Sequence, residues 1–304
     1  MDKYLITIVG PTAIGKTSLS IEIAKHFNTE IISSDSRQFY KEMAIGTAVP
    51  SQFELDIVKH HFIQNLSIHD DYSVGQFEKD VIHKLTELYK KYNCVVMVGG
   101  SGLYVDAVLK GLDDFPEVDS RIRENLKLQL KEDGIVPLQK QLKELDVETS
   151  QKIDIDNQQR LIRALEICIG TGKPFSSFLT NKTVLRNFIP VKIGLIADRK
   201  IIYNRINQRV DRMIDNGLLD EAKNLFQYSH LNALQTVGYK ELFSYMNNEN
   251  TLDFAISEIK KNTRRFAKRQ LTWYRKDTEI RWFDFQEESD KIIQYIEHMI
   301  NFKF

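Results

Sequence analysis

The stretch of sequence that decides the fold is Gly10-Pro11-Thr12-Ala13-Ile14-Gly15-Lys16-Thr17. It has a glycine, four further residues and then Gly-Lys-Thr, which is the spacing of a loop whose backbone N–H groups cradle phosphates. The apolar residues 4–9 before it predict a buried strand, and residues 18–25 after it predict a helix. The sequence therefore predicts a strand, a tight turn and a helix N-terminus in the order that forms an anion site.

The residue types of this loop suit a di- or triphosphate, such as that of a nucleotide. Glycines let several N–H groups point inward, the helix dipole adds partial positive charge, and Lys16 adds a full charge. All eight residues, 10–17, are candidate phosphate contacts, and the Thr17 hydroxyl is a candidate ligand for Mg²⁺. The loop predicts what is bound and leaves open what is done with it.

The composition is that of an ordinary globular protein: 304 residues, 42% hydrophobic and 28% charged, with a net charge of zero. That length favours one domain with an insertion, or two domains. Cys94 and Cys168 lie in apolar runs and are expected to be buried, inert thiols in a reducing compartment. The N-terminus predicts a strand rather than a signal peptide, and no apolar run approaches the roughly 20 residues of a membrane span. We therefore expect a cytoplasmic protein.

Apolar strand candidates alternate with helical patterns along most of the chain. This alternation predicts a parallel sheet with helices on both faces, an α/β fold of the P-loop type. Ligands bind beyond the carboxyl ends of the strands in such sheets, which makes candidate site loops of residues 10–17, 35–38, 99–104 and 198–205. The strand candidates are residues 3–9, 30–34, 94–98, 191–197 and 280–283.

Residues 113–189 interrupt this alternation, because they have helical spacing and contain no strand candidate. We predict an all-helical insertion domain at 113–189 within an α/β core formed by residues 1–112 and 190–304. Such an insertion either carries a substrate function or is a structural decoration.

Asp35 follows the second strand candidate and is expected at the same edge of the sheet as the glycine-rich loop. A carboxylate beside an anion site suits a general base or an outer ligand of Mg²⁺. The alternative is a residue that only caps the next turn.

Gly99-Gly100-Ser101-Gly102 follows the third strand candidate. Three glycines allow the backbone to approach a ligand closely and Ser101 presents a hydroxyl, although a simple strand-to-helix turn has the same composition. The adjacent pair His60-His61 is a poor metal site, because neighbouring side chains point to different sides.

A run near the end of the chain, residues 260–276, contains eight cationic residues and no acidic residue. Aromatic residues are interleaved with the charges at Phe266, Trp273 and Tyr274. A chain of zero net charge that concentrates positive charge in this way indicates a polyphosphate or nucleic-acid partner. The alternative is a solvated helix face.

Arg205, Arg209 and Arg212 follow the fourth strand candidate at helical spacing and form one stripe. The stripe either reaches back over the phosphates or forms surface ion pairs.

Together these segments resemble the bacterial type of tRNA dimethylallyltransferase, also called tRNA isopentenyltransferase, over nearly the whole chain. The Gly-Tyr-Lys-Glu and Ala-Lys-Arg-Gln segments are far more specific than the phosphate loop. Besides residues 10–17, the matching segments are Asp35-Ser36-Arg37-Gln38 with Tyr40, Ile45-Gly46-Thr47-Ala48, Tyr72-Ser73-Val74, Gly99-Gly100-Ser101-Gly102-Leu103-Tyr104, Gln159-Arg160-Leu161-Ile162-Arg163-Ala164-Leu165-Glu166, Leu234-Gln235-Thr236-Val237-Gly238-Tyr239-Lys240-Glu241 and Thr263-Arg264-Arg265-Phe266-Ala267-Lys268-Arg269-Gln270-Leu271-Thr272-Trp273.

The resemblance implies transfer of a dimethylallyl group from dimethylallyl pyrophosphate to the exocyclic amino group of adenosine 37 of tRNA, next to the anticodon. It implies Mg²⁺ as a cofactor and a helical insertion that grips the anticodon stem-loop, and we expect a monomer. It further implies catalytic roles for Asp35 as the base, for Ser101 and Thr17, and for Arg209 on the pyrophosphate. The implied tRNA contacts are Asp35, Ser36, Arg37, Gln38, Ser101, Arg123, Gln159, Arg160, Leu161, Ile162 and Arg163.

The chain departs from the family pattern at several positions. Ser101 stands where the family has Thr and keeps the hydroxyl. Glu42, Ala44 and Val49 stand where the family has Gly, Asp and Lys, so one basic contact is missing at Val49.

Three other functions use the same loop. A P-loop nucleotide or nucleoside kinase shares the cradle, Mg²⁺ and an Asp, but gains nothing from the cationic run. An adenylate isopentenyltransferase would move the same group onto free AMP or ATP. An RNA-binding switch that binds a nucleoside triphosphate would need no catalytic base.

Overall fold

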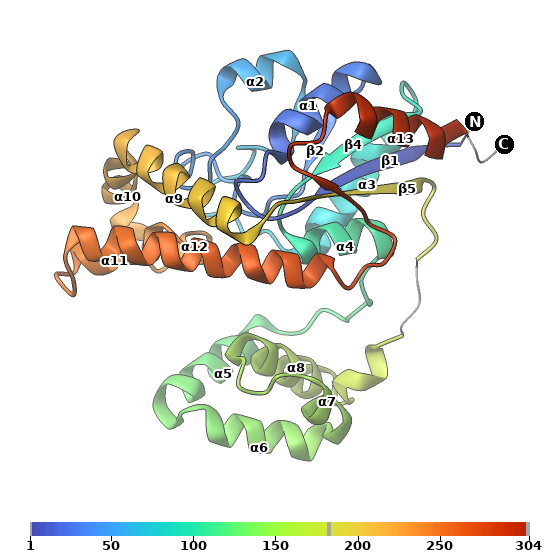
Figure 1. Cartoon of the computed structure of the whole chain (residues 1–304). Helices are drawn as coiled ribbons and strands as arrows, with labels where there is room; N and C mark the ends of the chain where they lie inside the picture. The colour runs from blue at the N-terminus through green and yellow to red at the C-terminus, as the bar shows by residue number, and fades with distance from the viewer. Residues whose placement is uncertain (1, 181–183, 302–304) are drawn as a thin grey trace. The chain divides into compact units, whose positions relative to one another are not determined.

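The computed structural model describes residues 2–180 and 184–301. Its centre is a sheet with helices packed around it (Figure 1). The sheet has six strands in the order β3-β2-β4-β1-β5-β6, and all five strand pairings are parallel. The predicted parallel α/β fold is confirmed, and each of the five predicted strands lies within two residues of its expected bounds. The prediction missed β3, which has only two residues, His60–His61, and no apolar run to mark it.

Helices alternate with the strands, as the sequence pattern predicts. The strands are β1 Tyr4–Val9, β2 Ile31–Ser33, β3 His60–His61, β4 Cys94–Val98, β5 Ile189–Ile196 and β6 Arg281–Asp284. The α-helices are α1 Lys16–His26, α2 Gln52–Ile57, α3 Val74–Leu88, α4 Gly102–Lys110, α5 Ser120–Asp133, α6 Ile135–Leu145, α7 Val147–Lys152, α8 Gln158–Thr171, α9 Arg199–Asp215, α10 Leu218–Leu225, α11 Tyr239–Met246, α12 Leu252–Tyr274 and α13 Ser289–Asn301.

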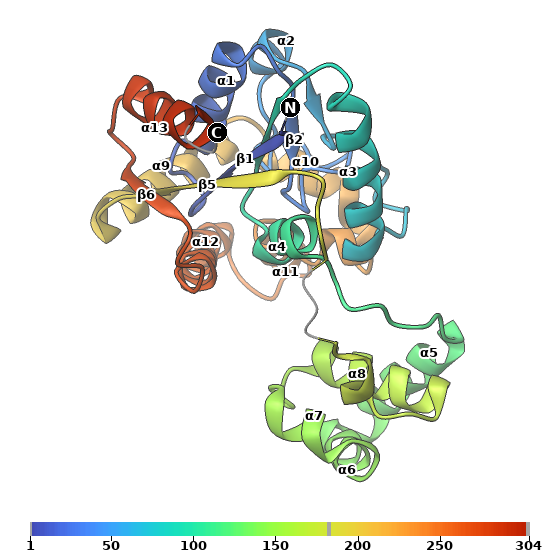
Figure 2. The ribbon, with the colours of Figure 1, turned by 90° about the vertical axis from the view of Figure 1, so that its right-hand side faces the viewer.

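Both faces of the sheet are covered, which explains why its central strands are apolar throughout rather than alternating. Figure 2 shows α1 and α13 on one side of the sheet and α3 and α4 on the other. In β1, Ile6 and Ile8 pack in one core with α1 and α13, whereas Leu5 and Val9 pack in a second core with α3 and α4. Every residue of β1 and of β4 is buried.

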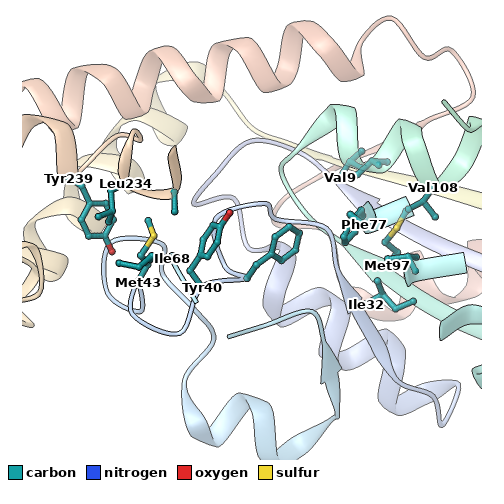
Figure 3. Close-up of a cluster of buried hydrophobic side chains, with 14 of the residues drawn as sticks. Val9, Ile32, Tyr40, Met43, Ile68, Phe77, Met97, Val108, Leu234 and Tyr239 are labelled. Atoms are coloured by element: carbon teal, nitrogen blue, oxygen red, sulfur yellow. The ribbon is translucent and has the colours of Figure 1, made fainter. Parts of the chain in front are cut away.

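The second core extends from the sheet to the helices near the C-terminus. Phe39 and Phe77 stack at a centroid distance of 5.3 Å and have no exposed surface. Figure 3 shows the core continuing from Val9 and Met97 of the sheet to Leu234 and Tyr239. One apolar interior therefore joins the start of the α/β core to segments more than 200 residues later in the chain.

The chain divides into two compact units, Met1–Lys110 with Arg186–Phe304, and Gly111–Leu185. The second unit is helical and has a core of its own. Leu126 of α5, Leu138 and Leu142 of α6, and Leu161 and Leu165 of α8 pack together in it. The limits of this insertion predicted from the sequence are residues 113 and 189.

Cys94 and Cys168 are free and buried, and burial raises the pKa of the Cys94 thiol to about 11. No helix among residues 2–180 and 184–301 is long and apolar enough to span a membrane.

Truncation of Phe77 tests the second core. Because its ring is fully buried, we expect Phe77→Ala to lower the free energy of unfolding by about 3–5 kcal/mol. Urea denaturation followed by circular dichroism would measure the change. Phe53→Ala is the matched control, since Phe53 is 75% exposed and its loss should change stability by less than about 0.5 kcal/mol. Equal denaturation midpoints for the two variants would contradict the assignment of this core.

Candidate active site

The glycine-rich loop connects β1 to α1 at the carboxyl end of the sheet. Gly15 has φ +111°, which a residue with a Cβ adopts only under strain, and α1 begins at the next residue. Gly10 lies so close to β5 that a Cβ there would be 2.7 Å from the carbonyl oxygen of Leu195. The turn therefore requires glycine at both ends and directs the positive end of α1 into a cavity.

Lys16 is held inside this loop. Its Nζ donates to the carbonyl oxygens of Gly10, at 3.0 Å, and Pro11, at 2.8 Å. Burial lowers the pKa of Lys16 to about 8; the Asp35 carboxylate opposes this shift and the Arg209 charge adds to it. An anion in the loop would favour the charged form of Lys16.

Two of the three predicted arginines of α9 reach the same loop. Arg205 Nε donates to the carbonyl oxygen of Ala13 at 2.7 Å, and Arg209 Nη1 donates to Thr12 Oγ1 at 3.3 Å. Burial lowers the pKa of Arg209, and the Asp35 carboxylate opposes that change. Neither arginine forms an ion pair with another residue that the structure describes, so the geometry favours the phosphate interpretation over surface ion pairs.

Asp35 lies two residues after the end of β2. Its Oδ1 accepts the Arg37 N–H at 3.1 Å, so one oxygen caps the turn, as the structural alternative proposed. The carboxylate also lines two cavities and is close enough to influence Lys16 and Arg209. The hydrogen bond from Arg37 fixes the orientation of the carboxylate but uses only one of its two oxygens.

The loop after β4 places Ser101 next to the loop that holds Asp35. Ser101 Oγ accepts the Ser36 N–H at 3.0 Å and lies 3.1 Å from Ser36 Oγ. The predicted juxtaposition of Ser101 with residues 35–38 is therefore present.

Two cavities meet at this edge of the sheet. The first has a volume of about 600 Å³ and is lined by the loop residues 12–17, with Arg205, Arg209 and Arg212. We call it the phosphate cavity, because these loop residues are the predicted phosphate contacts. The second cavity, of about 840 Å³, is lined by Ser36, Arg37, residues 100–104 and the helices near the C-terminus. The residues that line both cavities are Thr12, Asp35, Thr47 and Arg209.

The second cavity combines apolar walls with polar groups, which is typical of small-molecule sites. Its apolar wall includes Leu103, Phe266 and Trp273, each more than a third exposed. Trp273 is held by a hydrogen bond from its Nε1 to Asp106 Oδ2 at 2.8 Å.

The cationic run lies on α12, which ends at Tyr274, and on the residues just after it. Lys260 pairs with Asp211 and Lys261 with Glu258. None of the other six cations of residues 260–276 forms an ion pair with a residue in the described part of the chain. We call these six the cationic surface: Arg264, Arg265, Lys268, Arg269, Arg275 and Lys276.

Several residues that were predicted to contact phosphate or tRNA form hydrogen bonds within the protein. Gly10 and Pro11 do not line the phosphate cavity and instead hold the Lys16 ammonium through their carbonyl groups. The Arg37 guanidinium donates to the carbonyl oxygens of Asn232 and Ala233. The Gln38 amide donates to the carbonyl oxygens of Thr47 and Ala48 and accepts from Ser33. Arg37 and Gln38 thus support the walls of the site.

In the insertion, Leu161 and Ile162 do not suit the predicted tRNA contact. They are 0% and 5% exposed and belong to the core of that unit, because α8 turns them inward. Gln159 and Arg160 are exposed at the start of α8. Arg123 and Arg163 both pair with Glu166, at 2.8 and 3.1 Å, and this pairing lowers the pKa of Glu166 against the effect of burial.

Four residues at the site have no role that could be predicted from the sequence pattern. Thr47 lines both cavities, and the Nε2 atom of His60 is buried beside the phosphate cavity without a hydrogen-bond partner among the described residues. Glu221 accepts the N–H groups of residues 44–46 at 2.8–2.9 Å and the Tyr239 hydroxyl at 2.6 Å. Gln270 joins the two loops that follow β1 and β4. These contacts link distant segments, so no local pattern marks them.

The fold is a P-loop α/β fold, and its phosphate cavity meets a second cavity at the Asp35 carboxylate. These features define a class of proteins that act on substrates carrying phosphate groups. The chain belongs to the IPP transferase family, whose model matches residues 38–277.

Relatives and solved structures agree with this family. The tRNA dimethylallyltransferase of Christiangramia forsetii is 64% identical over 99% of this chain and 100% of its own length. The crystal structure of the tRNA isopentenylpyrophosphate transferase of Bacillus halodurans is 39% identical, with a TM-score of 0.71 over 99% of this chain and 96% of its own. A eukaryotic dimethylallyltransferase described as acting on tRNA is 25% identical, with a TM-score of 0.81 over 98% of this chain and 79% of its own.

The pKa of Lys16 predicts how anion binding responds to pH. The free protein holds the Lys16 proton below about pH 8 and loses it above, so affinity for inorganic pyrophosphate should fall by up to about tenfold per pH unit above pH 8. Calorimetric titration at a series of pH values would measure this fall.

Lys16→Arg provides the control, because arginine stays charged throughout this range. The protonation of pyrophosphate changes with pH in the same way in both experiments. The ratio of the two affinities therefore isolates the effect of the Lys16 charge. A ratio that is constant across pH 8 would contradict the prediction.

Proposed function

We propose that this chain transfers the dimethylallyl group of dimethylallyl pyrophosphate to the exocyclic amino nitrogen of the adenosine just 3′ of the anticodon, position 37 of tRNA. The protein is a prenyl-transferring enzyme of tRNA modification. The observation that carries the proposal is the placement of Asp35, which lines both the phosphate cavity and the second cavity. A carboxylate at that junction lies where the two substrates would meet.

The phosphate cavity suits the leaving group. As the bond between the allylic carbon and the pyrophosphate oxygen breaks, negative charge develops on that oxygen. Lys16, Arg209 and the N–H groups at the start of α1 would stabilise this charge. Electrostatic stabilisation by fixed groups of this kind is usually the largest catalytic contribution.

Asp35 would act as the base. The amino nitrogen forms the new bond to carbon and loses a proton, and the carboxylate accepts that proton as pyrophosphate departs. An amino group conjugated to a purine is a poor nucleophile, so a base in contact with it is needed. The Arg37 N–H fixes one carboxylate oxygen, and Ser101 stands beside the same turn.

The donor set of the phosphate cavity fits Mg²⁺. Mg²⁺ prefers oxygen ligands and usually takes only one or two from the protein, with substrate phosphates and water supplying the rest. The Thr17 hydroxyl lines the cavity and makes no hydrogen bond to another described residue, and it would hold the ion. No group of three His, Cys, Asp or Glu suited to a metal occurs in the described ranges. A bound Mg²⁺ would neutralise charge on the pyrophosphate.

The second cavity and the cationic surface suit the RNA. The target base must leave its stack to enter a pocket, at a cost of a few kcal/mol. A cavity of about 840 Å³ with Phe266 and Trp273 in its wall provides room and stacking partners for a purine. We further propose that the exposed Gln159 and Arg160 of the insertion contact the tRNA, and that Arg123 and Arg163 do so while paired to Glu166.

Two alternative activities are less well supported. The family assignment and the names of the relatives favour prenyl transfer over phosphoryl transfer by a kinase. Transfer to free AMP or ATP would make no use of the cationic surface. We propose that the enzyme works as a monomer in the cytoplasm, where tRNA is found.

Asp35→Asn tests the base. The amide keeps an acceptor for the Arg37 N–H but cannot take the proton, so we expect kcat to fall by about 10²–10⁴-fold with tRNA affinity nearly unchanged. Mass spectrometry of tRNA after incubation with dimethylallyl pyrophosphate and Mg²⁺ measures transfer. Asp56→Asn, an exposed substitution of the same kind, is the control.

Unchanged turnover of Asp35→Asn would remove Asp35 as the base. If the wild-type protein left tRNA unmodified but moved a phosphoryl group from ATP to a mononucleotide, the kinase would replace the transferase. Replacing tRNA with AMP in the same assay tests whether the dimethylallyl group is transferred to a free nucleotide, as an adenylate isopentenyltransferase would do.

Reversing two charges tests the cationic surface. Lys268→Glu with Arg269→Glu should weaken tRNA binding and reduce the slope of log affinity against log salt by about two, since each lost phosphate contact removes about one. Pyrophosphate affinity should be unchanged. Lys90→Glu with Lys91→Glu makes the same change of net charge before β4, at the opposite edge of the sheet. Equal losses of tRNA affinity in the two double variants would show that only net charge matters.

A further inference from the structure

Gln270 is the buried polar residue of α12 and turns away from the cationic surface. Its neighbours Lys268 and Arg269 are exposed, whereas Gln270 is 5% exposed. Its Oε1 accepts the Thr12 N–H at 2.9 Å, and its Nε2 donates to the Gly100 carbonyl oxygen at 2.9 Å. A single buried amide therefore bridges two loops that lie far apart in the chain.

These two loops line the two cavities in which the substrates of the proposed reaction would bind. The loop with Thr12 follows β1 and holds Lys16 and Thr17, while the loop with Gly100 follows β4 and holds Ser101. Because β1 and β4 are neighbouring strands, the loops emerge side by side. Gln270 and Gly100 also line the second cavity, and a Cβ on Gly100 would be 3.8 Å from Asp35 Oδ2. The bridge thus stands at the junction of the two cavities.

The chemistry of the two partners allows only one side chain of this length. The Thr12 N–H can only donate and the Gly100 carbonyl can only accept, so the bridging group needs an acceptor and a donor. An ionised Glu would face the Gly100 carbonyl with a second acceptor, and a Met would satisfy neither partner. Glycine at position 100 is required as well, because a Cβ there would lie 2.2 Å from Gln270 Nε2.

We propose that Gln270 is a positioning residue for the transfer reaction. It fixes the spacing between the phosphate loop and the loop of residues 99–102, and so aligns the allylic carbon with the attacking nitrogen. This inference rests on the proposed function. A misplacement of about 1 Å in such an arrangement can cost about 10²-fold in rate.

Gln270→Glu is the decisive variant. At neutral pH we expect kcat to fall by about 10²-fold, while the dissociation constants of tRNA and of inorganic pyrophosphate change by less than about threefold. As the pH falls, protonation of the introduced carboxyl group restores a donor to the Gly100 carbonyl oxygen. The ratio of variant to wild-type kcat should therefore rise toward acid pH. Burial raises the pKa of a carboxyl and brings this recovery toward neutrality.

Two further variants separate positioning from stability. Gln270→Met keeps the shape and loses both hydrogen bonds, so its kcat should fall without recovering in acid. Gln286→Glu makes the same chemical change at an exposed position and should match the wild type. Thermal denaturation of each variant reports whether the fold is intact.

Three outcomes would overturn the inference. The first is a wild-type kcat for Gln270→Glu at every pH. The second is a loss of tRNA and pyrophosphate binding in step with kcat, or unfolding of both Gln270→Glu and Gln270→Met, which would make the role structural. The third is a wild-type protein that prenylates no tRNA, which is the failure of the proposed function itself. If the wild type is active, the first two outcomes refute the positioning role alone.

Discussion

The position of the site depends on β1, which is held on both edges and both faces. It is hydrogen-bonded to β4 on one side and to β5 on the other, and all of its residues are buried. Any shift of this strand would break two ladders and expose apolar side chains to water. The loop of residues 10–17 therefore begins at a fixed point, and Gly10 is packed against β5. A rigid origin of this kind keeps the N–H groups at the start of α1 directed at one place.

Polar side chains from α10 and α11 also hold segments of the site in place. Glu221 of α10 gathers the N–H groups of residues 44–46, and the Tyr239 hydroxyl shares the same carboxylate. Tyr239 is fully buried and leaves no room for a Cβ at Gly46. Buried hydrogen bonds such as these cost little when complete and much when one partner is lost. They hold the walls of the second cavity without closing it.

The sequence predicted which segments lie together at the carboxyl edge of the sheet better than it predicted the contacts between them. The phosphate loop, Asp35 and Ser101 could be placed together because each follows a strand at the carboxyl edge, where parallel strands bring their loops together. Arg209 lies inside α9 and could be placed only from its helical spacing with Arg205 and Arg212. The prediction that Leu161 and Ile162 contact a partner was taken from a motif, and the motif did not separate the buried face of α8 from its exposed residues. β3 was not predicted, because its two histidines give no periodic pattern of apolar residues.

By itself, the sequence determined the fold class, the glycine-rich turn between the first strand and the first helix, and the family, since local periodicity and a special backbone conformation depend on neighbouring residues. Only the tertiary structure decided that two cavities meet at Asp35, that Lys16 is held by Gly10 and Pro11, and that Gln270 ties the loops of Thr12 and Gly100 together. The physical reason is that a hydrogen bond between residues 12 and 270 depends on how the intervening chain packs. No short segment of sequence records that packing.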